Sequence, residues 1–191
     1  GKEQKDFMGV MMRNGITALL AMFILLAVPL RSYSRPFAIM LAIPFGLIGA
    51  FWGHILTGFD LSMFSIIGIM ALTGIVVNDS LVLIDYTDKQ RKEKGLGAVD
   101  AVIAGGTRRF RAILLTTMTT FAGLTPLLLE KSLQARFMLP MAVSLAFGVV
   151  FATFITLVLI PAFYLIIEDF HELPGKVKRL WTSGSAPIEE A

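Results

Sequence analysis

The sequence contains no cysteine, and charged residues make up only 16% of its 191 positions. The lack of cysteine excludes disulfides, thiolate metal sites and cysteine nucleophiles within this chain. His54 and His171 lie far apart and have no metal-ligand spacing, which argues against a zinc site, so no metal or cofactor is expected. Soluble domains carry about 25% charged residues. The low charge and a hydrophobic content of 55% therefore place the chain in the membrane class.

Hydrophobic runs in the sequence are long enough to cross a bilayer as helices. A polar connection follows the third run, and within it Leu96–Ala104 is amphipathic and is expected to lie at the membrane surface until Gly105-Gly106 ends it. The predicted fold is an all-α polytopic transmembrane helix bundle with five spans and a cytoplasmic interfacial helix between spans three and four. The expected parts are an interfacial lead-in at 1–14, spans at about 15–30, 37–57, 61–86, 112–129 and 137–167, a connection at 87–111 and a polar tail at 168–191.

The positions of lysine and arginine predict the orientation of these spans. Twelve of the 17 basic residues fall on the side that holds the 31–35 turn, the 87–111 connection and the C-terminal tail. That side is expected to be cytoplasmic, which places the N-terminus in the periplasm. The chain begins with Gly1 and shows no signal peptide, so we expect it to be a piece of a longer protein.

Span three carries the polar run Asn78-Asp79-Ser80 more than halfway along its length. An ionised carboxylate is costly in hydrocarbon, so Asp79 should face the bundle interior, pair with a cation or be protonated. One interpretation of the run is interhelical hydrogen bonding that sets helix packing. The other, which we favour, is an ion or proton pathway.

Span four opens with an arginine cluster and continues into four threonines. Arg109 and Thr116 are seven residues apart and so share a helix face. The cluster can also be explained as an anchor for lipid phosphates, and the threonines as hydrogen-bonding their own helix. Close helix packing is predicted for small residues at three- and four-residue steps in spans two and three, namely Gly46, Gly49, Gly53, Gly68 and Gly74.

The run GIVVNDSLVLIDY at 74–86, with the segments 26–74 and 108–166, resembles the last membrane spans of resistance-nodulation-division (RND) transporters, most closely their hydrophobe/amphiphile efflux branch. The resemblance covers about residues 7–170 and implies spans eight to twelve of a twelve-span, proton-driven exporter of hydrophobic or amphiphilic compounds. It also implies a homotrimer in the bacterial inner membrane, which can join a periplasmic adaptor and an outer-membrane channel.

The resemblance further implies a proton relay, in which acidic residues on span four are answered by a lysine on span ten and by an arginine and a threonine on span eleven. The last two positions fall on Arg109 and Thr116. The lysine position falls on Asn78, and Asp79 follows it. This departure leaves three possibilities, namely that Asp79 carries the proton, that Asn78 hydrogen-bonds a shared proton, or that another cation is coupled.

A second hypothesis is that the chain is a transport-inactive membrane fragment that serves as a structural or assembly module, because the acidic span is not in it. An enzyme is not expected, since no catalytic constellation appears. The basic stretch Lys89–Lys94 has no interleaved aromatic residues, so no nucleic-acid partner is expected. Expected partners are lipid and the remaining spans and periplasmic domains of the same transporter.

Overall fold

The computed structural model describes residues 2–183, and within them the side chains of residues 5–169. Every regular element in this part of the chain is a helix, and five stretches are long and apolar enough to cross a membrane. The predicted all-α fold class is therefore confirmed. The helices are α1 (Lys2–Leu30), α2 (Ser34–Met40), α3 (Ile43–Thr57), α4 (Met63–Lys94), α5 (Ala98–Leu129) and α6 (Leu133–Ser183).

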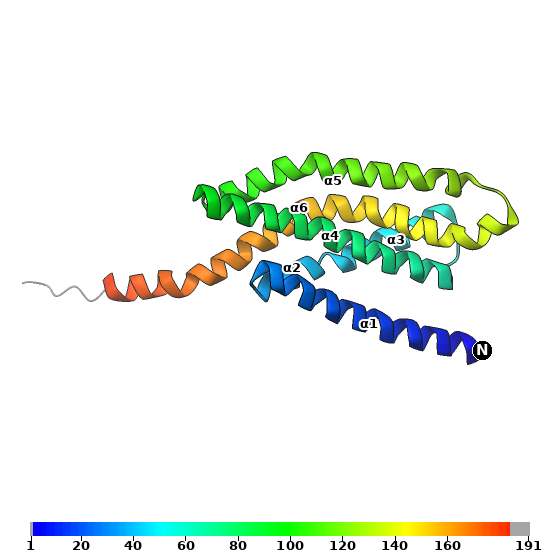
Figure 1. Cartoon of the computed structure of the whole chain (residues 1–191), viewed down its shortest axis with the longest axis horizontal. Coiled ribbons are helices and arrows are strands. Elements are labelled where there is room, and N and C mark those ends of the chain that lie inside the picture. The colour runs from blue at the N-terminus through cyan, green and yellow to red at the C-terminus, as the bar shows by residue number, and fades with distance from the viewer. Residues whose placement is uncertain (1, 184–191) are drawn as a thin grey trace, which may run out of the picture.

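Helix α6 is the centre of the bundle, and α3, α4 and α5 all pack along it (Figure 1). Helix α1 leans away from the other helices and contacts α2 and, more sparsely, α4. The α1–α2 and α4–α5 turns lie at one end of the bundle, together with the end of α6 that leads to the C-terminus. The α3–α4 and α5–α6 connections lie at the opposite end (Figure 1).

Small residues bring α3, α4 and α6 together. A Cβ atom added at Gly53 would lie 2.5 Å from Cβ of Phe147, and one at Gly68 would lie 2.5 Å from the carbonyl oxygen of Met141. Gly49 faces Phe151 just as closely, and Gly46 has Leu72 at 3.4 Å. Gly49, Gly53 and Gly68 therefore sit where a larger residue would force the helices apart, whereas Gly46 makes an ordinary van der Waals contact. Gly74 has no neighbour within 4 Å of such an atom.

The helix ends follow from local sequence. Gly58 and Gly95 end α3 and α4 with φ of 69° and 63°, a left-handed conformation that glycine adopts without a Cβ penalty. Helix α4 begins with a capping box, in which the Ser62 side chain accepts from the Ser65 backbone and the Ser65 side chain accepts from the Ser62 backbone. The polar residues at these positions thus satisfy backbone groups that a helix leaves unpaired.

Helix α5 departs from the sequence prediction. The expected break at Gly105-Gly106 is wrong, because α5 runs without interruption from Ala98 to Leu129. The physical reason is packing. Gly105 lies against the side chain of Thr87 on α4, so its missing Cβ permits a close helix contact and does not end a helix.

Two other helix bounds also differ from expectation. The second apolar run is divided, since α2 ends at Met40 and α3 begins at Ile43, with Pro44 in the first turn of α3. Proline fits there because the first backbone N–H groups of a helix have no intrahelical acceptor. Helix α6 continues to Ser183, and the end of the expected polar tail, 184–191, lies outside the described residues.

Candidate functional site

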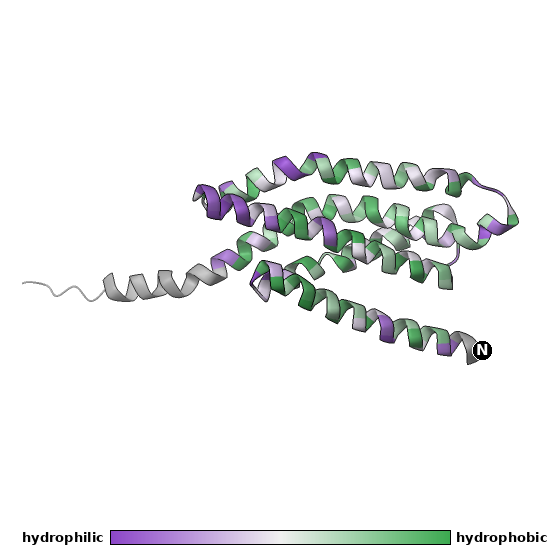
Figure 2. Ribbon diagram, in the orientation of Figure 1, coloured by the Kyte–Doolittle hydropathy of each residue, from purple (hydrophilic) through white to green (hydrophobic). Residues whose placement is uncertain are grey.

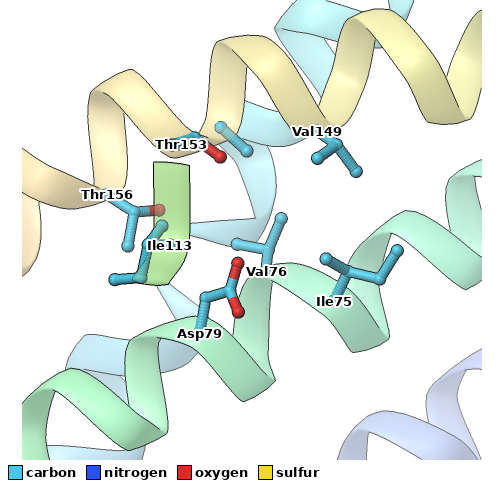
Figure 3. A pocket seen from close by; sticks show the side chains of 8 residues that line it. Ile75, Val76, Asp79, Ile113, Val149, Thr153 and Thr156 are labelled. Carbon is cyan, nitrogen blue, oxygen red and sulfur yellow. The ribbon is translucent and has the colours of Figure 1, made fainter. Parts of the chain in front are cut away.

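Asp79 on α4 points into a small cavity between α4, α5 and α6 (Figure 3). The cavity has a volume of about 10 Å³, enough for about one water molecule. Apolar side chains make up most of its wall, so little around the carboxylate replaces the hydration it would have in water. The lining residues are Ile75, Val76, Asp79, Ile113, Val149, Ala152, Thr153 and Thr156.

Threonines supply the other polar atoms near this carboxylate. Thr153 and Thr156 on α6 line the cavity, and both side chains are buried. The Thr117 hydroxyl donates to the Ile113 carbonyl at 3.0 Å. Because a hydroxyl has only one hydrogen, Thr153 is the donor and Thr117 the acceptor in the 2.6 Å hydrogen bond between their side chains. This pair joins α5 to α6 beside the cavity.

The structure separates the predicted site residues into two groups. Asp79 is half-buried and faces the cavity, whereas Asn78 and Thr116 are exposed. The Thr116 hydroxyl donates to the Ala112 carbonyl of its own helix at 3.0 Å. Because successive helical residues are rotated by about 100°, neighbours such as Asn78 and Asp79 cannot face the same partner.

Arg109 lies on α5 against Tyr86 of α4, with its guanidinium carbon 5.1 Å from the ring centroid. Tyr86 is two turns from Asp79, which corresponds to about 10 Å along the helix. Within the described residues, Nε of Arg109 is a buried polar atom without a hydrogen-bond partner. Arg109 is thus held by a cation–π contact and retains a donor for a further acceptor.

The model of the AcrB/AcrD/AcrF family matches residues 3–168, which is nearly the whole chain. The chain belongs to this family. Two crystal structures of a heavy metal efflux pump, crystal forms I and II, are each 31% identical to it over 80% of its length, with TM-scores of 0.69 and 0.72. The chain spans 15% of the length of each of these pumps.

This AcrB/AcrD/AcrF-family chain also contains polar contacts that the sequence reasoning missed. The His54 imidazole on α3 contacts the Ser144 hydroxyl at 2.8 Å and the Phe59 carbonyl at 2.9 Å. Since the carbonyl can only accept, Nδ1 donates to it, and Nε2 hydrogen-bonds with the Ser144 hydroxyl, which joins α3 to α6. The sequence signal was a single histidine in an apolar run, which does not indicate its partner.

A larger polar cluster was missed at the bundle end that holds the α4–α5 turn. It comprises Arg35, Asp88, Arg91, Tyr164 and Glu168. Arg35 and Arg91 had been counted only as orientation signals. The sequence signal would have been these two arginines together with the carboxylates Asp88 and Glu168, since all four lie near the ends of spans that meet on one side.

Proposed function

We propose that the chain forms the C-terminal membrane portion, spans eight to twelve, of a proton-driven RND efflux transporter. The observation that carries this proposal is the Asp79 carboxylate, which sits in a cavity among three helices of an AcrB/AcrD/AcrF-family chain. Burying an ionisable residue within a membrane span is costly, and such residues are rare outside proton and ion pathways. Asp79 is therefore best explained as part of such a pathway.

In this mechanism Asp79 is the group that gains and loses the proton. Proton uptake removes the charge from the apolar cavity, and proton release restores it, so the two states favour different packing of α4 against α5 and α6. The cavity admits about one water molecule, which supplies a path to the carboxylate. Of the three possibilities left by asparagine at the lysine position, this proposal selects the one in which Asp79 carries the proton.

Asn78, Arg109 and Thr116 form the outward part of the proposed relay. Asn78 and Thr116 are exposed in this chain, and Nε of Arg109 has no hydrogen-bond partner. The exposed Asn78 and Thr116 are open to an acidic span contributed by the rest of the transporter, and the half-buried Arg109 would turn its guanidinium toward that span. The proposed partner carboxylate would pair with Arg109, while Asn78 and Thr116 hydrogen-bond to it.

The test compares two carboxylates of α4 in the full-length transporter. Asp79→Asn is expected to reduce proton-dependent export at least about tenfold, because the amide of asparagine cannot bind and release a proton at neutral pH. Asp85→Asn is the matched control, since Asp85 pairs with Lys89 at the surface, 2.7 Å away, and should leave export unchanged. Export at the wild-type rate by Asp79→Asn, with expression and thermal stability also unchanged, would refute the relay.

The coupling ion is tested by collapsing each gradient separately. A protonophore should stop export by the wild-type transporter, whereas removing the sodium gradient should not. The reverse result would assign another cation to Asp79 and remove the proton from the proposal.

The proposed substrates are hydrophobic or amphiphilic compounds, as the family resemblance implies. A second candidate substrate class, heavy-metal ions, is favoured by the description of the two similar crystal structures. Cells that lack their own pumps and express the full-length transporter would distinguish the two. Asp79-dependent resistance to dyes and detergents supports the first class, and Asp79-dependent resistance to metal salts supports the second.

We further propose that the transporter is a homotrimer in the inner membrane, able to join a periplasmic adaptor and an outer-membrane channel, with its N-terminal segment periplasmic and its C-terminal segment cytoplasmic.

The competing proposal is that this chain is a transport-inactive assembly module. Liposomes that contain this chain alone are expected to show no proton flux, because the relay lacks its acidic partner. Flux abolished by Asp79→Asn would instead assign a complete pathway to this chain.

A further inference from the structure

Five side chains from α2, α4 and α6 form a closed polar network away from the Asp79 cavity. The two guanidinium nitrogens of Arg35 pair with Asp88 Oδ2 and, at 3.2 Å, with Glu168 Oε1. The second Glu168 oxygen pairs with Arg91, and the Tyr164 hydroxyl donates to Asp88 Oδ1 at 2.7 Å. The Arg35 guanidinium also lies 5.6 Å from the centroid of the Tyr164 ring.

Every one of these contacts joins two different helices. Arg35 is on α2, Asp88 and Arg91 are on α4, and Tyr164 and Glu168 are on α6. Arg35 is the one residue of this network that α2 contributes, and it contacts both α4 and α6. The planar fork of arginine permits this, since it can present separate N–H groups to two carboxylates.

The network is largely removed from solvent. The side chains of Arg35, Asp88 and Glu168 are 16%, 9% and 12% exposed. Replacing a buried ion pair with apolar residues of similar volume is often neutral or stabilising, because desolvation offsets the attraction between the charges. Overall stability is therefore a weak reason for this cluster, and selection of one helix arrangement is a better one.

The segment that Arg35 holds is a short helix with a junction at each end. On one side, Arg31 adopts a positive φ of 45° in the turn that follows α1. On the other side, Leu41 and Ala42 separate α2 from α3, and both residues keep right-handed helical dihedrals, so this junction is a turn and not a sharp bend. The short helix α2 thus lies between the Arg31 bend and the Leu41–Ala42 turn, and Arg35 supplies its charged contacts to the bundle.

The other two helices of the network, α4 and α6, also contribute residues to the proposed proton site. Helix α4 carries both Asp79 and Asp88, and α6 carries both Thr156 and Glu168. A shift of α4 against α6 at the cavity would change the distances within the network, and opening the network would free that shift. The two sites are linked through rigid helices.

We propose that this network is a latch, which holds α2 against α4 and α6 in one state of the transport cycle and opens in another. Interfaces of this kind switch between discrete arrangements by exchanging salt bridges. The role in transport depends on the proposed efflux function, whereas the opening of the latch is a change in distance that can be measured without export.

The experiment uses the full-length transporter in lipid nanodiscs, with its native cysteines removed. Cysteines are introduced at two exposed positions, Phe37 on α2 and Lys92 on α4, and carry spin labels for pulsed distance measurements. The wild type is expected to show a dominant distance and a minor longer one. Arg35→Gln should raise the share of the longer distance at least about threefold, and Arg35→Lys should lie between them, because one ammonium cannot replace the fork.

Lys89→Gln is the matched control, because the Lys89–Asp85 pair lies on the same helix but is exposed and joins no second element. It should leave the distance distribution unchanged. If Arg35→Gln does not fold, Arg91→Gln removes the link to Glu168 and should shift the distribution in the same direction. A single distance that neither Arg35→Gln nor Arg91→Gln alters would overturn the latch.

A cross-linking step distinguishes a latch from a permanent fastening. A bifunctional maleimide, with a spacer that matches the dominant distance, joins the two cysteines of the closed form. Export should fall at least about tenfold after cross-linking, and should persist when a monofunctional maleimide modifies the same cysteines. Continued export by the fully cross-linked transporter overturns the opening step. If Asp79→Asn exports normally while Arg35→Gln still shifts the distances, the proposed relay fails and the latch stands.

Discussion

Two adjacent threonines on α5, Thr116 and Thr117, lie on different faces of the helix. Both hydroxyls donate to a carbonyl of their own helix, but Thr116 faces out of the bundle, whereas Thr117 also accepts from the Thr153 hydroxyl of α6. Sequence reasoning selected Thr116, because it lies two turns from Arg109. Which of several neighbouring threonines turns inward depends on how α5 is rotated against α6, and that rotation is set by packing that the sequence pattern does not encode.

These two residues give opposite predictions. Thr117→Val should lower the stability of the protein by about 1 kcal/mol, since Thr153 loses its acceptor and can recover only a carbonyl of its own helix. Thr116→Val should leave stability unchanged but reduce export, because this residue belongs to the proposed relay surface. Thermal unfolding in detergent and an export assay, both on the full-length transporter, measure the two effects. A loss of stability in Thr116→Val and none in Thr117→Val would contradict the assignment of the faces.

Asp79 shows how far a single-residue prediction can reach. A carboxylate deep in an apolar run was identifiable from the sequence, and the structure turns it toward a cavity. Ile75 and Val76 of α4 are local, but the other residues of the cavity wall come from α5 and α6, at least 30 positions further along the chain. Nothing in the local pattern around Asp79 specifies them. The relay roles of Asn78, Asp79, Arg109 and Thr116 remain a prediction.

At the scale of the helix, the apolar runs were readable because a span needs about 20 consecutive apolar residues. Breaks within the runs were harder to place. Two glycines in a row predicted the end of a helix at Gly105-Gly106, yet α5 continues through them. Membrane helices tolerate glycine where a neighbouring helix approaches closely, and here that neighbour is Thr87. The same residue type can end one helix and bring two others together.

Replacing each of the two adjacent glycines on α5 with alanine is predicted to change protein stability in opposite directions. Gly105→Ala should destabilise the protein by about 1–3 kcal/mol, because the new Cβ would collide with Thr87. Gly106→Ala should stabilise it by up to about 1 kcal/mol, since alanine is the better helix former and its Cβ meets nothing within 4 Å. Equilibrium unfolding of the two variants in mixed micelles provides the measurement. Equal effects at both positions would show that the α4–α5 crossing is not close at Gly105.

At the scale of the whole molecule, the hydrophilic residues concentrate at the end of the bundle that holds the α4–α5 turn, while the middle of the helices is hydrophobic (Figure 2). Lysines and arginines account for much of this asymmetry. Twelve of the 17 are predicted to lie on this side, and Arg35, Lys89 and Arg91 form ion pairs there. Without these three the balance is nine to five, which still favours the same side as cytoplasmic.

This balance leads to a topology prediction for the full-length transporter. Lys94 precedes the α4–α5 turn and Lys131 lies in the α5–α6 connection, at opposite ends of the bundle, and both are exposed. The chain has no cysteine of its own, so Lys94→Cys and Lys131→Cys each introduce one new thiol into it. A membrane-impermeant maleimide applied to spheroplasts should label Lys131→Cys above the background of the unmodified transporter. It should label Lys94→Cys only after the inner membrane is permeabilised. The opposite labelling pattern would mean that the basic end faces the periplasm, and the Asp79 site would then have to be reconsidered, because protons would approach it from the other end of the bundle.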